Sequence, residues 1–181
     1  MEIWKERFSA LQREIMRFLF LWAGKSFNQR QLAIKLGVSS TAIAKSIIGL
    51  KKENLIIAVK DKETGRIELT LNRDNTSITY LKRIENLKFL HESELLDFLI
   101  EKFGLDTIIL FGSYSRGEDI FSSDIDIAII GVGEKDLNLN KFEDMLKRKI
   151  SLHYFNNIKG ISKNLKNGIL SGIILHGGID I

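Results

Sequence analysis

The sequence predicts an α+β fold built in two parts, and three observations support this prediction. Apolar residues recur at helical spacing through much of the first hundred residues, and short β-branched runs separated by turns become frequent later. The charge also changes: residues 1–90 carry 17 Lys and Arg against 9 Asp and Glu, whereas residues 91–181 carry 10 against 14. A basic part followed by an acidic part indicates two domains with different partners, although an uneven but inert surface would give the same counts.

The composition restricts the class of protein. The chain has 181 residues, of which 44% are hydrophobic and 28% are charged, as in an ordinary soluble globular protein. It has no cysteine, which excludes disulfides and thiolate metal sites. No apolar run reaches the roughly 18 residues of a membrane span, and the charged start differs from a secretory signal. We therefore expect a cytoplasmic protein without membrane contact.

The first part of the chain shows a pattern of short helices. One apolar stripe at helical spacing consists of Ile3, Phe8, Leu11, Ile15, Phe18, Leu19 and Trp22. A shorter stripe ends at Gly37, and Ser39 or Ser40 can cap the helix that follows, whose buried face is Ile43, Ile47 and Leu50. Two short helices joined by a tight turn with a glycine are typical of the helix-turn-helix.

Two strand-like runs follow these helices, Leu55–Val59 and Arg66–Leu71, and the turn between them contains a glycine. A helix-turn-helix followed by a basic hairpin resembles the winged-helix DNA-binding domain, over roughly residues 10–73. This resemblance implies that the second short helix reads the major groove and that the hairpin touches phosphate or the minor groove.

The side chains that would contact double-stranded DNA are short hydroxyls and cations, which reach phosphates and base edges. They are Ser39, Ser40, Thr41 and Lys45 on the helix, and Lys60, Lys62 and Arg66 on the hairpin. A winged helix that serves protein contact or dimerisation is the alternative. A homodimer is expected if the DNA site has paired half-sites.

Residues 76–104 predict two further helices that act as a connector between residues 1–75 and residues 105–181. One apolar stripe runs through Ile78, Leu81, Ile84, Leu87 and Leu90 or His91, and a second through Leu95, Leu96, Leu99 and Phe103, with Ser93 as a possible cap. The first stripe could join the two domains or pair two chains.

The acidic part carries an unusual pair of carboxylates. Thr107–Phe111 predicts a buried strand that ends at Gly112 and Ser113, and a second strand starts with Asp124 and Asp126. Side chains alternate across a strand, so the two aspartates share a face. Like charges on one face repel, and a bound metal ion is the usual reason to keep them together.

Beyond the aspartates, this segment resembles the nucleotidyltransferases of the DNA polymerase β superfamily, and most closely their minimal domains. The matching positions are Gly112, Ser113, Arg116, Gly117, Ser123, Asp124 and Asp126. The resemblance extends from about Thr107 to the C-terminus and includes the tail at residues 167–180. It predicts a small α/β domain with a mixed sheet after the winged helix-turn-helix.

The resemblance also implies roles for these residues. Asp124 and Asp126 would be catalytic and would bind Mg²⁺ or Mn²⁺, which neutralises charge on the phosphates of an NTP. Gly112 would let backbone N–H groups approach the triphosphate, and the Ser113 hydroxyl would bond a phosphate oxygen. Arg116 would either pair with phosphate or brace the loop.

One position departs from the family pattern. A third carboxylate is expected on the next strand, residues 149–155, and in our register it falls at Ser151. His153 shares that face and is either a base or a half-buried bystander. Glu118 and Asp119 are expected on the loop. Helices are expected at 139–148 and 162–170.

These features predict a nucleotidyltransferase-fold protein that binds NTP and divalent metal, transfers a nucleotidyl group to an acceptor, and binds DNA. Minimal domains of this family often act with a small helical partner protein, sometimes as toxin–antitoxin pairs. The alternative is a DNA-binding regulator or antitoxin-like protein with a catalytically degenerate domain. A transcription factor with an unrelated α/β dimer domain is a third reading.

Overall fold

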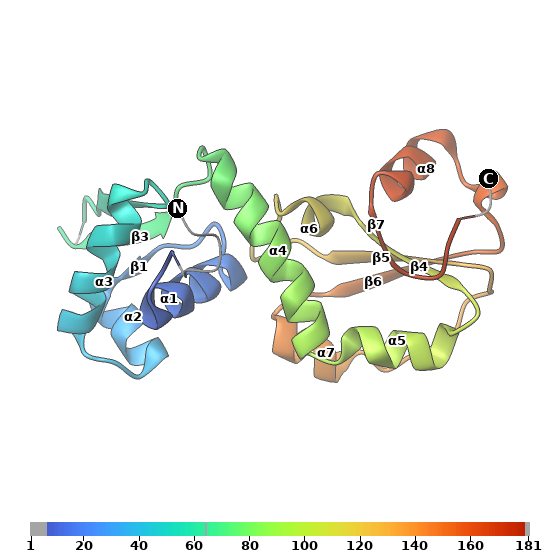
Figure 1. The fold of residues 1–181 in the computed structure, drawn as a ribbon, viewed down its shortest axis with the longest axis horizontal. Coiled ribbons are helices and arrows are strands. Elements are labelled where there is room, and N and C mark those ends of the chain that lie inside the picture. Colours follow the sequence, from blue (N-terminus) through green and yellow to red (C-terminus); the bar gives the residue numbers. More distant parts are fainter. Residues whose placement is uncertain (1–6, 64, 180–181) are drawn as a thin grey trace. The chain divides into compact units, whose positions relative to one another are not determined.

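The chain forms two compact units that divide between Ile78 and Thr79. A computed structural model describes residues 7–63 and 65–179, and Figure 1 traces their helices and strands. The first unit combines helices with a small antiparallel sheet, and the second has helices around a mixed sheet. The predicted α+β fold is thereby confirmed.

Short helices and strands make up the first unit, in the order that the sequence predicts. Its elements are α1 (Ala10–Leu21), β1 (Phe27–Asn28), α2 (Gln29–Leu36), α3 (Ser40–Lys52), β2 (Ile56–Lys60) and β3 (Ile67–Leu71). The core between them is apolar and includes Ile15, Leu19, Leu32, Ile43, Leu50 and Leu69, each at most 1% exposed.

The start of α1 is fixed by a capping box, which the apolar stripe did not reveal. The Ser9 side chain accepts a hydrogen bond from the backbone N–H of Gln12, and the Gln12 side chain accepts one from the Ser9 N–H. Phe8 therefore precedes the helix, contrary to our prediction, and Ile3 lies outside the described residues.

The turn of the helix-turn-helix follows the predicted chemistry. Gly37 ends α2 in the left-handed region, with φ of 67°, where a side chain would be strained. Of the two serines that could cap α3, Ser39 does so, because its hydroxyl accepts a hydrogen bond from the Ala42 N–H.

A three-stranded antiparallel sheet completes the winged helix. β2 and β3 pair from Ile56 opposite Leu71 to Lys60 opposite Ile67. On the other side of β3 lies β1, which has only two residues and gave no periodic signal in the sequence.

The second unit comprises helices that surround one four-stranded sheet. Its elements are α4 (Thr76–Glu92, which begins in the first unit), α5 (Leu95–Phe103), β4 (Thr107–Phe111), α6 (Gly112–Arg116), β5 (Ile125–Ile130), α7 (Asn140–Leu146), β6 (Ile150–Phe155), the 3₁₀ helix η1 (Ile158–Gly160), α8 (Lys163–Leu170) and β7 (Ile173–His176).

The sheet is mixed, as predicted. Its strand order is β6-β5-β4-β7; β5 and β6 are parallel, and β4 is antiparallel to both β5 and β7. Parallel neighbours require a crossover, and α7 provides it between β5 and β6. The carboxylates at the start of β5 are therefore beside the start of β6.

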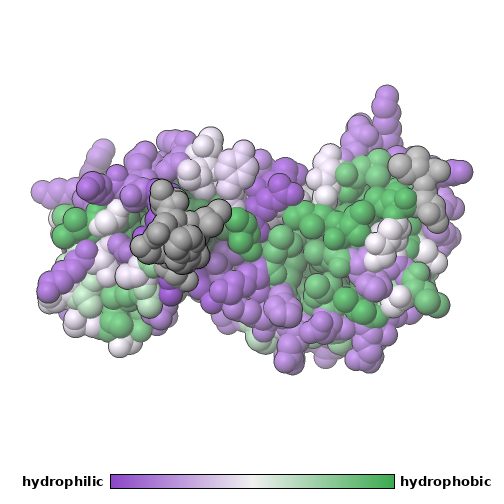
Figure 2. Space-filling view, in the orientation of Figure 1, coloured by the Kyte–Doolittle hydropathy of each residue, from purple (hydrophilic) through white to green (hydrophobic). Residues whose placement is uncertain are grey.

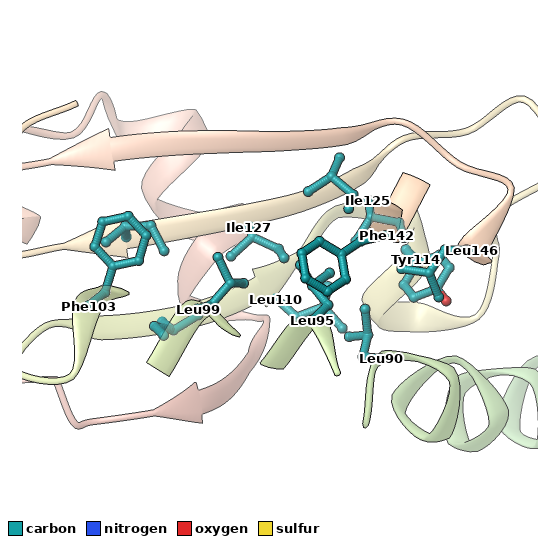
Figure 3. Packing of buried hydrophobic residues seen from close by; sticks show 13 residues of the cluster. Leu90, Leu95, Leu99, Phe103, Leu110, Tyr114, Ile125, Ile127, Phe142 and Leu146 are labelled. Atoms are coloured by element: carbon teal, nitrogen blue, oxygen red, sulfur yellow. The ribbon is translucent and has the colours of Figure 1, made fainter. Parts of the chain in front are cut away.

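Apolar residues cover both faces of this sheet. Figure 3 shows side chains from α5, β4, β5 and α7 that point toward one another, among them Leu99, Leu110, Ile127 and Phe142. On the opposite face, a smaller cluster includes Ile109, Phe111, Ala128, Ile161 and Ile169. All five residues of β4 are buried, because this strand lies between the two clusters.

Our prediction for α4 was partly wrong. Ile84, placed in the buried stripe, is 64% exposed, whereas Lys82 and Asn86 are buried together with Ile78 and Leu90. The buried face of α4 thus follows a spacing of four residues and includes two polar side chains, which an apolar pattern cannot detect.

No single helix among the described residues is long and apolar enough to cross a membrane, although α2 and α3, which are bent by 110°, meet the criteria of length and composition together. In the view of Figure 2, hydrophobic surface gathers over the strands of the second unit, and hydrophilic side chains predominate over α5.

Candidate functional site

Three strands bring the predicted site residues together. Phe111, the last residue of β4, pairs with Asp126 on β5, and Asp126 pairs with Ser151 on β6. Gly112 follows Phe111 directly, so the glycine, the aspartate and the serine meet at one end of the sheet. This is the register that the sequence predicted for Ser151.

Gly112 allows the backbone to approach a carboxylate closely. Its φ is 73°, a conformation that L side chains rarely adopt. A Cβ atom at this position would overlap the carboxylate of Asp126. A glycine is therefore required here both for its backbone conformation and for the space next to Asp126.

The two aspartates differ in exposure. Asp124 is exposed and lies just before β5, whereas Asp126 is half-buried within the strand. The Ser151 hydroxyl donates a hydrogen bond of 3.4 Å to Asp124 Oδ2. The carboxylate of Asp124 thus lies beside β6, the strand that also pairs with Asp126.

His153 lies two residues beyond Ser151, on the same face of β6. Its Nε2 is 3.3 Å from Asp126 Oδ1, and its ring meets the ring of Phe111 edge to face, with centroids 5.1 Å apart. The imidazole is therefore directed at Asp126, and Ser151 at Asp124.

Ser113 and Arg116 lie on the short helix α6, next to Gly112. Ser113 is partly buried, and its backbone carbonyl accepts a hydrogen bond from the Glu118 N–H. Arg116 is exposed, and its Nε donates to Glu118 Oε2 at 2.7 Å. The Arg116–Glu118 pair closes the turn after α6, which agrees with a bracing role and does not exclude a contact with phosphate.

A buried charged network supports the loop that carries Asp124. Asp119 is 1% exposed; its Oδ1 accepts from Lys82 Nζ at 2.6 Å and from Asn86 Nδ2 at 2.8 Å. Its Oδ2 accepts from Arg148 Nη2 at 3.4 Å. One carboxylate thereby joins α4, the loop after α6 and the short turn between α7 and β6.

Neighbouring groups extend this network. Asn86 Nδ2 also donates to the carbonyl of Tyr114, and burial together with the Asp119 carboxylate raises the pKa of the Tyr114 phenol well above its usual range. Gly117 packs so closely that a Cβ atom would overlap the backbone of α4 at Thr79. The segment from Tyr114 to Asp119 is therefore firmly held against α4.

The sequence contained only a weak signal for this network. Lys82 and Asn86 are four residues apart on a helix, which places them on one face. Their partner Asp119 is 37 and 33 residues away, and Arg148 is 29 residues beyond Asp119. Asp119 does lie on the expected loop, but nothing in the sequence indicates that it is buried.

Comparison with known proteins identifies this part of the chain. Residues 92–176 match the family described as nucleotidyltransferase domain. The second unit contains a nucleotidyltransferase domain. The buried network is partly outside the matched residues, because Lys82 and Asn86 precede residue 92.

The chain was also compared with curated proteins and solved structures. No curated protein matches it. The adhesin competence repressor AdcR of Streptococcus pyogenes is 20% identical, over 54% of this chain and 69% of AdcR, with a TM-score of 0.40. ZitR of Lactococcus lactis is 17% identical, over 57% of this chain and 65% of ZitR, also with a TM-score of 0.40. Likeness at this level assigns neither ligand nor activity.

The nucleotidyltransferase domain offers oxygen ligands rather than a closed metal cage. Within residues 7–63 and 65–179, no group of three or more His, Asp or Glu side chains is arranged to hold a metal ion. Mg²⁺ in phosphoryl-transfer sites is commonly held by one or two carboxylates together with substrate phosphates. Asp124 and Asp126 fit that arrangement, in which the nucleotide completes the coordination.

The first unit exposes every residue that the sequence predicted for DNA contact: Ser39, Ser40, Thr41, Lys45, Lys60, Lys62 and Arg66. The Ser39 hydroxyl is engaged as the cap of α3. Arg66 lines a groove of about 660 Å³ together with Arg30, Gln29 and Gln31 of α2. The sequence did not single out these three residues, because they precede the predicted recognition helix.

Proposed function

We propose that this protein binds an NTP with a divalent metal ion in its nucleotidyltransferase domain, transfers a nucleotidyl group to an acceptor, and binds double-stranded DNA through its winged helix. The observation that carries the proposal is the approach of Asp126 to the backbone of Gly112. This contact places a carboxylate beside the loop where the family binds phosphates.

Each residue of the site has a distinct task in this proposal. Asp124 and Asp126 hold Mg²⁺ or Mn²⁺, and the metal, when bound, neutralises charge that develops on the phosphate oxygens. Gly112 leaves room for the triphosphate at the backbone, and the Ser113 hydroxyl bonds a phosphate oxygen. Arg116 either contacts phosphate or holds the turn through Glu118.

The residue opposite Asp126 favours a second candidate function. Ser151 occupies the position where a third carboxylate would activate the acceptor hydroxyl, and a serine is a much weaker base. A protein that binds the metal–nucleotide complex without turnover would be a DNA-binding regulator or an antitoxin-like protein, with nucleotide or a small helical partner protein as its ligand.

The DNA-binding part of the proposal rests on exposed cations and hydroxyls of the first unit. Lys45 on α3 and Lys60, Lys62 and Arg66 on the hairpin would neutralise phosphates, so that affinity falls steeply as salt increases. Binding as a homodimer to paired half-sites is expected. The cytoplasmic location remains a prediction from the sequence.

Transfer of a radiolabel tests the enzymatic proposal. The full chain is incubated with each α-labelled NTP and Mg²⁺ or Mn²⁺, and DNA, RNA and total cell protein are offered as acceptors. If the label becomes covalently attached to one of these acceptors, and Asp124→Ala abolishes the attachment, the protein is an enzyme and its acceptor class is known. No label, with MgATP or MnATP still bound, leaves the regulator as the function.

A salt titration tests the DNA-binding proposal. We expect the logarithm of the affinity for duplex DNA to fall linearly with the logarithm of the salt concentration, and Lys45→Ala to reduce that slope by about 0.9, the value for one phosphate contact. If the affinity for duplex DNA changes neither with salt nor in Lys45→Ala, the first unit serves protein contact instead of DNA binding.

A further inference from the structure

The imidazole of His153 has a fixed orientation toward Asp126. Side chains two residues apart on a strand share a face, so His153 lies on the face of Ser151, which pairs with Asp126. The distance from Nε2 to Asp126 Oδ1 is 3.3 Å. Phe111, which is buried, packs edge to face against the ring and restricts its rotation.

We propose that His153 and Asp126 bind the same divalent metal ion, and that this imidazole makes the site prefer Mn²⁺ to Mg²⁺. The inference rests on the proposed function, since it names a further ligand in the same metal–nucleotide site. It assigns to His153 a role that is distinct from that of the missing carboxylate at Ser151.

The separation of the two atoms agrees with joint coordination. Nitrogen and oxygen ligands bind small divalent ions at about 2.1 Å, and two ligands at roughly a right angle are then about 3 Å apart. The 3.3 Å between Nε2 and Oδ1 is close to that value. Both side chains are partly exposed, at 36% and 30%, so an ion and its water ligands can reach them.

The chemistry of the ligands determines the preferred metal. Imidazole is a ligand of first-row transition metals, most strongly of Zn²⁺, Cu²⁺, Ni²⁺ and Fe²⁺. Mn²⁺ belongs to this series and accepts a nitrogen ligand more readily than Mg²⁺, which is bound almost entirely through oxygen. Two carboxylates and a neutral imidazole also provide less negative charge than three carboxylates. The second carboxylate of the proposed site is Asp124, which accepts a hydrogen bond from Ser151, two residues before His153 on β6.

Pulsed electron paramagnetic resonance tests this proposal directly. The full chain is loaded with Mn²⁺ alone and with Mn²⁺ plus each of ATP, GTP, CTP and UTP. We expect modulation from an imidazole ¹⁴N in the wild-type chain and its loss in His153→Gln. Even groups that only support a metal ligand change metal affinity by about 10–100-fold when removed, so we expect His153→Gln to weaken Mn²⁺ binding at least tenfold. Mg²⁺ binding should change much less.

The chain offers matched controls, because it has three histidines. His91 is exposed on α4, and His176 Nε2 lies 3.1 Å from the carbonyl of Gly104, so neither touches Asp126. His91→Gln and His176→Gln should keep both the ¹⁴N signal and the affinity. His153→Ala provides a second variant, and circular dichroism verifies that each variant is folded.

The outcomes separate this inference from the proposed function. Mn²⁺ that binds with nucleotide and is lost in Asp126→Ala, but shows no ¹⁴N signal and is unchanged in His153→Gln, would overturn only the role of His153. A wild-type chain that binds no Mn²⁺ with any nucleotide would overturn the proposed function and this inference together.

Discussion

Asp119 and Asp126 belong to the same unit, but their surroundings differ. Asp119 is 1% exposed and accepts hydrogen bonds from Lys82, Asn86 and Arg148, so its charge is compensated by the protein itself. Asp126 is half-buried, and its neighbours are the glycine backbone and one histidine. The first carboxylate is fully engaged inside the domain, whereas the second is the one that we propose as a metal ligand.

Burial and the number of hydrogen-bond donors around a carboxylate distinguish these two residues of one domain. A buried ion pair loses much of its Coulomb energy to desolvation, so it persists only with good geometry and several hydrogen bonds. A partly exposed carboxylate keeps much of its hydration, so its charge costs little desolvation free energy. Its oxygens also retain lone pairs that can bind a cation. Four substitutions test this comparison.

Removal of Asp119 should have the largest effect on stability. Asp119→Ala removes the buried anion that Lys82 and Arg148 share, and breaking a buried pair typically lowers the free energy of unfolding by about 3–5 kcal/mol. Urea denaturation measures the loss. Glu118→Ala removes the exposed pair with Arg116 and should lower the free energy of unfolding by no more than about 1 kcal/mol. Equal losses in the two variants would contradict the distinction.

Removal of Asp126 should affect ligand binding rather than the fold. We expect Asp126→Ala to change the free energy of unfolding by no more than about 0.5 kcal/mol without ligand. It should abolish the stabilisation by MgATP or MnATP, which amounts to about 2.7 kcal/mol when the ligand is at 100 times its Kd. Thermal unfolding with and without the metal–nucleotide complex measures both quantities.

Asp136→Ala is the matched control for that experiment, because Asp136 is exposed on the loop before α7. It should leave both the fold and the ligand-linked stabilisation unchanged. If Asp126→Ala retains the full rise in melting temperature, the assignment of the site is wrong.

A methyl group at Gly112 should disturb both the backbone and the site. Gly112→Ala places a side chain at positive φ and against the Asp126 carboxylate, so we expect a loss of about 1–3 kcal/mol in the free energy of unfolding. The stabilisation by MgATP should also disappear. Gly133→Ala is the control, because a Cβ there meets no atom within 4 Å. A Gly112→Ala protein that binds MgATP normally would refute the close approach as the basis of the site.

A third carboxylate at position 151 should lower stability slightly and raise activity. Ser151→Asp places like charges side by side across two strands, which destabilises by about 0.2–1 kcal/mol, and divalent metal should remove this loss. Label transfer should appear or increase. Asn156→Asp, on the exposed loop after β6, serves as the control. A folded Ser151→Asp protein without added transfer would show that the missing carboxylate does not limit activity.

Much of this site follows from local rules that a sequence reveals. Alternation along a strand predicts that Asp124 and Asp126 share a face, and the parallel register places Ser151 opposite Asp126, as observed. Apolar runs likewise predicted β4 and β5, whereas β6 was expected from the resemblance to the nucleotidyltransferase family, because Ser151 and His153 interrupt its apolar residues.

The features that the sequence did not predict depend on distant partners. Lys82 and Asn86 are buried because Asp119 and Arg148 fold against them, whereas the apolar Ile84 on the same helix is exposed. The direction of His153 depends on packing against Phe111, 42 residues earlier in the sequence. The strand β1 has only two residues, too few to show an alternation of apolar and polar side chains, so only its pairing with β3 defines it.

The strand β6 is an edge strand of the four-stranded sheet, so another polypeptide could add a strand beside it. Among the residues that the structure describes, only β5 pairs with β6, so the backbone groups on the other side of β6 face away from the sheet. A strand from another polypeptide that paired there would lie about 4.8 Å from the backbone of Ser151 and His153. An added strand would therefore lie next to the two residues of β6 that contact Asp124 and Asp126.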